Sequence, residues 1–462
     1  MKLVTNLAGQ VYKFQSVTEV LAKANDEKSG DNLARIAATS AKERVAAMDV
    51  LSHLTMQDLR ANPVLSESDQ VTALVDAALD ATAYEKIKNF SVGEMREFIL
   101  SDKTSADDIA AVRSGINGEM AAAVAKLMSN IDLVLAAKKC PVIVKANTTL
   151  GLPGRLSARL QPNHPSDNVE GIMASIYEGL SYGVGDAVIG INPVFDTADT
   201  VARLLDETAK LIDGLQIPTQ NCVLSHISTQ IKAIERGARA GLIFQSIAGS
   251  EAGNKAFGID NDLILQAVAL GANQHKSAAD QHENNRRFMY FETGQGSELS
   301  SNTHNGADQV TLEARCYAYC RLFDPFLVND VVGFIGPEYL ATGKQMIRAG
   351  LEDHFMAKLL GLPMGVDACY TNHMQCDQND LETLTVLLTS AGVNYFMGVP
   401  MGDDVMLSYQ STSFHDIASL REIFNLRPAP EFETWLENMG LMKNGRLTDN
   451  AGDPSFLATA KV

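Results

Sequence analysis

The sequence predicts an α/β fold: a (β/α)8 TIM barrel with an N-terminal helical domain and a short C-terminal extension. Three observations support this prediction. After Lys139, short apolar segments alternate with amphipathic ones, glycine follows the last apolar position of several amphipathic segments, and the alternation occurs eight times. A strand followed by a helix implies parallel strands, and eight such units favour a closed barrel over an open sheet.

Residues 1–115 form the first predicted domain, which is helical in pattern and richer in charge. Apolar residues spaced by three and four predict helices within 17–27 and 33–51, and Phe90 leads into a further one. A longer helix, 119–139, is expected to carry the chain into the second domain. No residue of the first domain carries recognisable chemistry, so we expect it to serve packing or assembly.

Residues 116–426 form the predicted barrel domain. Its strands are short apolar runs, which are expected at 142–145, 187–191, 222–226, 242–245, 289–292, 331–335, 364–367 and 395–399. Several of the helices between them are expected to end where glycine follows an apolar stripe, as at Gly214, Gly271 and Gly392. A polar stretch, 271–287, is expected to extend a surface loop, and 427–462 form the C-terminal extension.

Length, charge and cysteine content narrow the class of protein. The chain has 462 residues, enough for a large core and a smaller domain, and its net charge of −18 argues against binding to nucleic acid or to an anionic membrane surface. We find no apolar segment typical of a signal peptide and no apolar run long enough to span a membrane. The six cysteines are scattered without a CxxC pair, so reduced thiols and a cytoplasmic location are expected.

Polar residues follow the apolar core of most predicted strands. In a barrel of this kind the carboxyl ends of the strands surround the active site. Those ends and the loops after them carry Asn147, Arg159, Gln161, Asn163, Asn192, His226, Gln245, Glu292, Asp367, Asp403 and Asp404. Glu292 ends the apolar run 288–291, and a glycine-rich turn, 293–296, follows it at once. Two strand-end carboxylates, a guanidinium and several amides suit a small polar substrate that carries a positive charge.

Motifs that would indicate other chemistry are missing. The sequence has no nucleotide-binding glycine motif, and no GxSxG or Cys–His arrangement that would supply a nucleophile. Cys316 and Cys320 lie four apart without a histidine pair and are expected to be core thiols. Difficult chemistry would therefore have to come from a bound cofactor. Two alternatives stay open: a metal-dependent or Schiff-base lyase that uses Lys145, and a scaffold in which the strand-end residues are dispensable.

Long segments of the chain resemble the large subunit of ethanolamine ammonia-lyases. The resemblance rests on LSARLQPN at 156–163, GVGDAVIG at 183–190, YFETGQGS at 290–297, VGFIGPEYL at 332–340, LEDHFM at 351–356 and CYTNH at 369–373. These segments occur in the order found in that family, and the similarity extends from Val11 to Ser455. Motifs of this length in the same order make the resemblance highly specific.

The resemblance implies an activity and partners. Members of this family convert ethanolamine to acetaldehyde and ammonia by adenosylcobalamin-dependent radical chemistry. Their large subunit is a barrel that holds the substrate, and a separate small subunit helps to enclose the cobalamin. The family assembles as a hexamer of such heterodimers and often works inside bacterial microcompartments. A DxHxxG cobalamin motif is absent, which agrees with a family that does not ligate cobalt through a protein histidine.

The resemblance also implies roles for individual residues. Substrate contacts are expected from Arg159, Leu160, Gln161, Asn192, Glu292 and Asp367, with Glu292, Arg159 and Asp367 as the catalytic residues. Cobalamin-side contacts are expected from Pro193, Gln245, Ser300, Phe334 and Met406. Within the substrate set, Glu292, Asp367 and Gln161 are expected to hold the ammonium group. Arg159 and Asn192 are expected to hold the hydroxyl group, and no protein ligand to a metal is expected.

Overall fold

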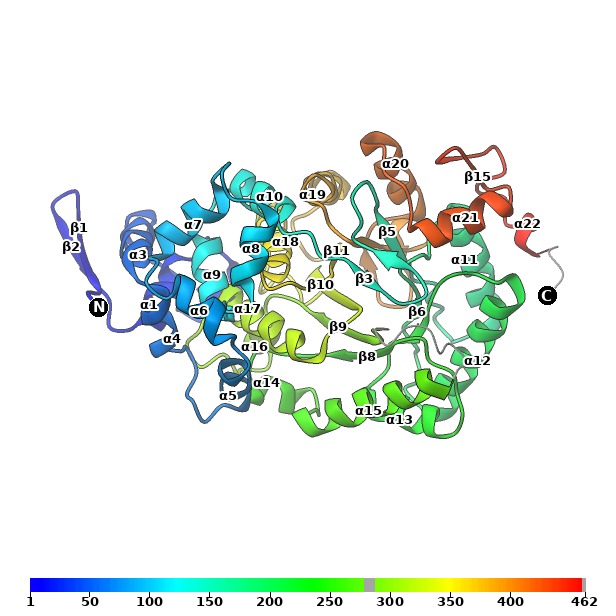
Figure 1. The fold of residues 1–462 in the computed structure, drawn as a ribbon, viewed down its shortest axis with the longest axis horizontal. Coiled ribbons are helices and arrows are strands. Elements are labelled where there is room, and N and C mark those ends of the chain that lie inside the picture. The colour runs from blue at the N-terminus through cyan, green and yellow to red at the C-terminus, as the bar shows by residue number, and fades with distance from the viewer. Residues whose placement is uncertain (278–286, 459–462) are drawn as a thin grey trace.

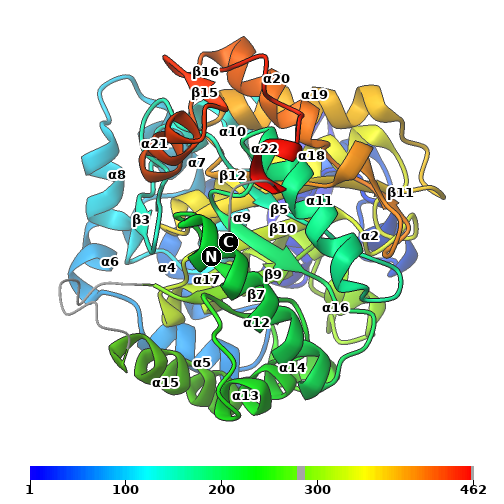
Figure 2. The same cartoon turned by 90° about the vertical axis from the view of Figure 1, so that its right-hand side faces the viewer.

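The computed structural model describes residues 1–277 and 287–458. Its centre is a barrel of parallel strands: β5 (Ser157–Leu160), β6 (Val188–Ile191), β7 (Asn221–Val223), β8 (Ile243–Ser246), β9 (Met289–Thr293), β10 (Leu327–Gly333), β11 (Met364–Thr371) and β12 (Tyr395–Gly398). Hydrogen bonds join them in the order β7-β6-β5-β12-β11-β10-β9-β8, so the sheet closes on itself except between β7 and β8. The predicted TIM barrel is confirmed (Figure 2).

A side-chain amide helps to bridge the gap between β7 and β8. Gln230 donates from Nε2 to the carbonyl oxygens of Ser225 and Phe244, both at 2.7 Å, and its Oε1 accepts from the Phe244 amide at 2.9 Å. On the other side of the gap, the Leu242 amide donates to the Asn221 carbonyl oxygen at 3.0 Å. These bonds satisfy backbone groups that would otherwise be left unpaired at two buried strand edges, and they keep the barrel wall continuous.

A helix covers the outside of the barrel after each strand, as Figures 1 and 2 show. In chain order these helices are α11 (Val169–Ser181), α12 (Ala198–Leu215), α13 (Ile227–Glu235), α15 (Asn261–Ser277), α17 (Gln309–Cys320), α18 (Gly343–Leu359), α19 (Gln378–Ser390) and α20 (Phe414–Phe424). Short helices α14 (Glu251–Ala256) and α16 (Ser297–Ser300) precede α15 and α17. The helices α17 and α18 are buried along nearly their whole length, because further helices cover their outer faces.

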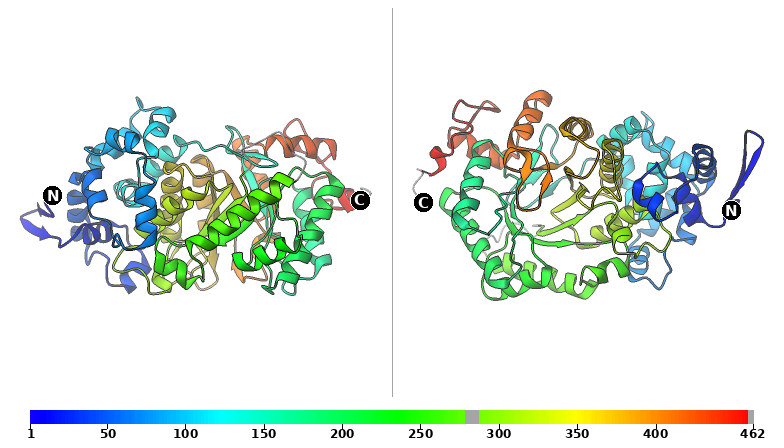
Figure 3. Two further views of the ribbon diagram at one scale, coloured as in Figure 1. Left: turned by 60° about the horizontal axis from the view of Figure 1, so that its bottom comes forward. Right: turned by 180° about the vertical axis from the view of Figure 1, so that it is seen from behind.

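Those covering helices come from the N-terminal part of the chain, which lies at one end of the molecule (Figures 1 and 3). They are α1 (Val17–Ala24), α2 (Ser29–Leu33), α3 (Ala41–His53), α4 (Met56–Ala61), α5 (Gln70–Ala77), α6 (Ala81–Ile87), α7 (Val92–Leu100), α8 (Ala106–Arg113), α9 (Gly118–Lys126) and α10 (Asn130–Lys138). A hairpin that the sequence pattern did not reveal, β1 (Val4–Leu7) and β2 (Gln10–Lys13), precedes them and projects from the body.

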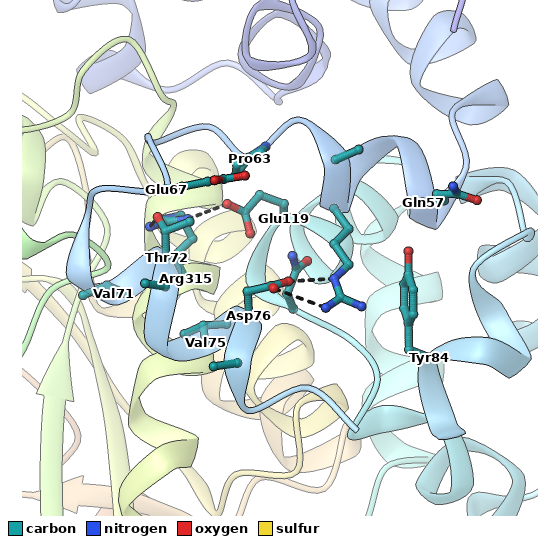
Figure 4. A pocket seen from close by; sticks show the side chains of 15 residues that line it. Gln57, Pro63, Glu67, Val71, Thr72, Val75, Asp76, Tyr84, Glu119 and Arg315 are labelled. Carbon is teal, nitrogen blue, oxygen red and sulfur yellow. Dashed lines mark hydrogen bonds and ion pairs between the residues drawn. The ribbon is translucent and has the colours of Figure 1, made fainter. Parts of the chain in front are cut away.

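Ion pairs fix the N-terminal helices to the barrel helices. Arg315 of α17 pairs with Glu119 of α9 and with Asp69 before α5, and it also donates to Thr72 at 2.8 Å. Arg315, Glu119 and Thr72 border a cavity of about 610 Å³, where Figure 4 shows Arg315 and Glu119 pointing toward each other. A buried charged side chain is costly unless an opposite charge pairs with it. The ion pairs of Arg315 therefore hold the N-terminal helices in one position against the barrel helices.

Several expectations about secondary structure were wrong. The helix end expected at Gly214 is one of them, because Gly214 lies inside α12 and the left-handed cap is Gln216. The first barrel strand is β5, because Val144 and Lys145 form β3 (Val144–Lys145) of a small antiparallel hairpin with β4 (Thr149–Leu150). The expected helix 119–139 is two helices, because Ser129 and Asp132 form a capping box that starts α10. The helix expected to stop before Gly271 continues to Ser277.

The remaining segments lie at the periphery. The expected surface loop 271–287 is helical up to Ser277, and 278–286 lie outside the described residues. After α20 the chain forms α21 (Pro430–Asn438), a hairpin of β15 (Met442–Lys443) and β16 (Arg446–Leu447), and α22 (Ser455–Ala458). Across the described ranges, no helix is long and apolar enough to cross a membrane.

Candidate active site

The carboxyl ends of the barrel strands surround a cavity of about 470 Å³. Among the residues that line it are Arg159, Gln161, Asn192, Pro193, Gln245, Glu292, Phe334, Asp367, Leu407 and Tyr409. They come from strands or loops on every side of the barrel, and the inward positions of β5, β9 and β11 place Arg159, Glu292 and Asp367 within one space. The convergence of strand-end polar residues expected from the sequence is therefore observed.

Arg159 lines the cavity and is 1 % exposed. Its Nη1 donates to Glu292 Oε1 at 2.6 Å and to Tyr290 Oη at 2.8 Å, and its Nη2 donates to Asn192 Oδ1 at 2.7 Å. Burial by itself lowers the pKa of the guanidinium, but the facing oxygens of Tyr290, Glu292 and Tyr409 outweigh burial and raise it. Gly190 makes room for this side chain, because a Cβ there would lie 2.7 Å from Arg159 Nε.

Glu292 lies on the same face of β9 as Tyr290, which precedes it by two positions in the strand. Its Oε1 accepts hydrogen bonds from the Arg159 guanidinium, from the Tyr290 hydroxyl group and, at 3.4 Å, from Asn329 Nδ2. The carboxylate is thus held by three donors at one oxygen, while its side chain borders the cavity. After Glu292 the chain turns at Gly294, where a Cβ would lie 2.7 Å from the Val331 carbonyl oxygen; this close approach requires glycine.

Asp367 lies on β11, which β5 and β12 separate from β6, the strand that Asn192 follows. A small hairpin, β13 (Asp403–Asp404) and β14 (Tyr409–Gln410), pairs with the end of β11. From it Tyr409 donates to Asp367 Oδ2 at 2.8 Å, and Ser411 donates to Oδ1. Burial raises the pKa of Asp367 to about 7, although the hydroxyl groups of Ser411 and Tyr409 act to lower it. The carboxyl group therefore changes charge near neutral pH.

Two amide side chains, those of Gln161 and Asn163, link these charged groups. Gln161 Nε2 donates to Asp404 Oδ2 at 2.6 Å and to Tyr409 Oη at 2.9 Å. Asn163 Nδ2 donates to the same Asp404 oxygen at 2.7 Å, and its Oδ1 accepts from the Asn192 backbone amide at 2.8 Å. Gln161 is 2 % exposed, so its orientation is set by this network and by the cavity.

The structure places the other predicted residues as follows. Pro193, Gln245 and Phe334 line the cavity, and the Phe334 ring packs edge-on against Tyr409 with 5.4 Å between centroids. Ser300 and Met406 are not among its lining residues: Ser300 ends α16 and is exposed, and Met406 lies half-buried in the turn between β13 and β14.

Three more predicted residues point away from the cavity or only border it. The Leu160 side chain faces outward against α11, where it lies closest to the site of a Gly179 Cβ. Asn147 bonds to Thr219 and Gln220 at the start of β7, away from the carboxyl ends of the strands. His226 borders the cavity and caps α13.

Strand-end reasoning did not find four residues of the site. They are Tyr290, Asn329, Tyr409 and Ser411, which donate to Glu292 or to Asp367. The period of two along a strand could have identified Tyr290, because Glu292 and Tyr290 must share a face. Tyr409 and Ser411 come after the last barrel strand, and no local pattern shows that their hairpin folds back onto β11.

Comparison with known proteins agrees with the resemblance. Residues 12–450 match the family model described as ethanolamine ammonia lyase large subunit. The chain is 59 % identical over 457 residues to the ethanolamine ammonia-lyase large subunit of Escherichia coli (strain K12) and 58 % identical to that of Salmonella typhimurium (strain LT2). Each alignment covers 99 % of this chain and 100 % of the relative.

Proposed function

Since the chain belongs to the ethanolamine ammonia-lyase large-subunit family, we propose that it catalyses the adenosylcobalamin-dependent deamination of ethanolamine to acetaldehyde and ammonia. The observation that carries this proposal is the polarity of the barrel cavity. The cavity offers acceptors, Asp367 and the Gln161 oxygen, together with donors from Asn192 and Arg159. A small molecule with a cation at one end and a hydroxyl group at the other matches this arrangement.

In this proposal the two ends of ethanolamine meet different groups. Glu292, Asp367 and Gln161 Oε1 hold the ammonium group, because a buried cation needs charged or strongly polar acceptors. Asn192 Nδ2 and the Arg159 guanidinium face the hydroxyl group, where donors stabilise charge that develops on oxygen during the reaction. Glu292 lies beside Arg159 and within the same cavity as Asp367, so it can accept a proton from the hydroxyl end and deliver it to the departing amine.

The residues present fit a large cofactor above the substrate. The cavity is open toward the mouth of the barrel, and Pro193, Gln245 and Phe334 of its lining would face the cofactor. Ser300 and Met406 lie outside the lining and would contact its periphery. Adenosylcobalamin supplies, when bound, a carbon-centred radical able to remove an unactivated hydrogen atom from the substrate. The protein then positions the substrate and excludes water.

We also propose that a small subunit covers the mouth. Large apolar side chains are exposed around it: Val194, Phe195, Phe334, Met401 and Val405. Exposed apolar side chains grouped around a polar cavity are typical of a surface that another chain or a cofactor covers. A hexamer of such heterodimers inside a microcompartment is the assembly that the family would use.

The Asp367 carboxyl group predicts a pH dependence. Because its pKa is raised to about 7 by burial, it is neutral below that pH and charged above it, whereas an alkylammonium group stays protonated throughout. We therefore expect kcat/KM for ethanolamine to rise with pH through about 7 and then level off. The Asp367→Asn variant should lose this rise and stay low at every pH. A wild-type profile that is flat between about pH 6 and pH 8, or an unchanged profile in the variant, would contradict the assignment; both follow from steady-state assays.

The proposed reaction is tested with the complex obtained by co-expression with a small subunit. Given adenosylcobalamin and ethanolamine, the complex should release acetaldehyde and ammonia in equal amounts and show the electron paramagnetic resonance signal of a radical pair. Omission of either ethanolamine or adenosylcobalamin should abolish both product release and the radical-pair signal. Turnover without adenosylcobalamin, or a signal-free complex that makes no acetaldehyde, would overturn the proposal.

The structure places Lys145, the lysine of the Schiff-base alternative, away from the barrel cavity. Lys145 lies in the β3–β4 hairpin outside the barrel, where its carbonyl oxygen accepts from the Arg287 amide. It does not line the cavity that holds Arg159 and Glu292. A scaffold role would leave unexplained why the strand-end residues form one bonded network around that cavity.

A further inference from the structure

Asp404 lies behind the cavity wall and is 3 % exposed. Its Oδ1 accepts from the backbone amides of Met406 at 3.1 Å and Leu407 at 2.7 Å. Its Oδ2 accepts from Gln161 Nε2 at 2.6 Å and from Asn163 Nδ2 at 2.7 Å. Asp404 does not line the cavity itself, so any effect on a bound molecule has to pass through these neighbours.

The hydrogen bonds of Asp404 determine which way the Gln161 amide points. An ionised carboxylate can only accept hydrogen bonds, so the Gln161 atom that faces it must be the amide nitrogen. Among the described residues, no donor is bonded to Gln161 Oε1, and Gln161 is part of the cavity lining. The carbonyl oxygen of Gln161 is therefore the atom offered to a bound molecule.

The neighbouring groups enforce the same direction. Tyr409 receives Gln161 Nε2 on its oxygen and gives its own proton to Asp367, so this hydroxyl group cannot also donate to Gln161. Asn163 is fixed in the same way, since its Oδ1 accepts from the Asn192 backbone amide. At the other side, the donor-only Arg159 turns Asn192 Oδ1 toward itself and leaves Asn192 Nδ2 for the cavity.

We propose that Asp404 is a positioning residue that makes the site selective for a cationic amine, by holding the Gln161 carbonyl oxygen toward the cavity. The inference rests on the proposed function in taking ethanolamine as the bound molecule. An acceptor at this place stabilises an ammonium group, whereas the amide nitrogen there would repel it. Asp404 never contacts the substrate and sets its selectivity through Gln161.

The Asp404→Asn substitution should reverse the Gln161 amide. The one remaining side-chain oxygen at this position is needed by the Met406 and Leu407 amides, so the new NH2 group faces the nitrogens of Gln161 and Asn163. Turning the Gln161 amide relieves one of these donor–donor contacts and brings Nε2 into the cavity, and the Tyr409 hydroxyl group then redirects its proton from Asp367 to Gln161 Oε1. The neighbouring Asp403 offers a matched control, because it is exposed and bonds only to Gln410 among the described side chains.

The test compares a cation with a neutral molecule of the same size. The complex of the large and small subunits is purified after co-expression. Kd values for ethanolamine and for ethylene glycol are then obtained from the rise in Tm of the complex with ligand concentration. Asp404→Asn should weaken ethanolamine binding by about tenfold or more, the loss expected when a hydrogen bond to a charged group is replaced by repulsion. Binding of ethylene glycol should change by less than about threefold, and Asp403→Asn should change neither.

A second variant distinguishes the proposed role of Asp404 from a general loss of folding. In Asp404→Asn/Gln161→Glu, a carboxylate at position 161 can accept from the new NH2 group at position 404 and still offer an oxygen to the cavity. Its affinity for ethanolamine should return to within about threefold of the wild type. Unchanged ethanolamine binding in Asp404→Asn, equal losses for both ligands, or no recovery in the double variant would each overturn the inference.

The outcomes separate this inference from the proposed reaction. If the wild-type complex forms no acetaldehyde but the cation-selective loss and its recovery are seen, the reaction is wrong and the role of Asp404 stands. If the wild type turns ethanolamine over and Asp404→Asn has an unchanged KM, the reaction stands and the role of Asp404 is wrong. If ethanolamine does not raise the Tm of the wild-type complex, the role of Asp404 is wrong.

Discussion

Glu292→Gln and Arg159→Ala are each expected to leave the fold intact and to lower kcat/KM for ethanolamine by about a hundredfold to a thousandfold. In the first variant the carboxylate that pairs with Arg159 at 2.6 Å becomes an uncharged amide. The ammonium group then loses an ionic partner, and the buried guanidinium loses its counter-charge. In the second variant, the donor facing the hydroxyl group is removed, so charge that develops on oxygen is left unstabilised.

Steady-state assays of the reconstituted complex, with Tm and circular dichroism as checks on folding, measure these effects. Glu338→Gln is the matched control, because Glu338 is an exposed acid in the loop after β10 and undergoes the same chemical change. It should retain wild-type kcat/KM. Near-normal turnover in both Glu292→Gln and Arg159→Ala would show that the barrel cavity is not where the reaction occurs.

Lys28→Met is expected to cost about 3–5 kcal/mol of stability, because it leaves a buried carboxylate without its main partner. Lys28 Nζ lies 2.8 Å from Glu352 Oε2, and both side chains are 0 % exposed. Burial by itself raises the pKa of Glu352, but Lys28 and Arg348 outweigh it and lower the pKa. The pair joins the N-terminal helices to α18, so its loss should loosen the packing between these two layers.

Urea denaturation at neutral pH measures this effect as a shift of the unfolding midpoint. Lys28→Met/Glu352→Gln should lose less stability than Lys28→Met, since the buried negative charge is also removed. Lys210→Met is the control: it breaks an exposed pair with Glu207 and should shift the midpoint little, because solvent screens such pairs. Equal midpoints for Lys28→Met and Lys210→Met would contradict the role given to the buried pair.

Much of the fold could be predicted because the barrel repeats one local pattern. Seven of the expected strands overlap barrel strands of the structure, and the helices between them follow the apolar stripes. The first strand was placed too early, since 142–145 are more apolar than β5, which contains Ser157 and Arg159. Burying an arginine in a strand is costly unless it is paired, and its partners, Tyr290 and Glu292, lie 131 and 133 residues further along the chain.

The candidate site could be predicted in part for a similar reason. Strand-end reasoning brought Glu292, Asp367 and Asn192 together, because parallel strands all end at the same side of a barrel. It could not find the β13–β14 hairpin that delivers Tyr409 and the buried Asp404, because that contact depends on long-range packing against β11. Asp404 was expected only as one of the polar residues at the strand ends and in the loops after them, and its bond to Gln161 became visible only in the structure.

The polarity of the barrel cavity is most directly tested by a structure of the complex with ethanolamine bound. We expect the ammonium nitrogen within hydrogen-bonding distance of Gln161 Oε1, Asp367 and Glu292, and the hydroxyl oxygen beside Asn192 Nδ2 and the Arg159 guanidinium. Ethanolamine bound in the reverse direction, with its ammonium group beside Arg159, or bound outside the cavity, would contradict the account.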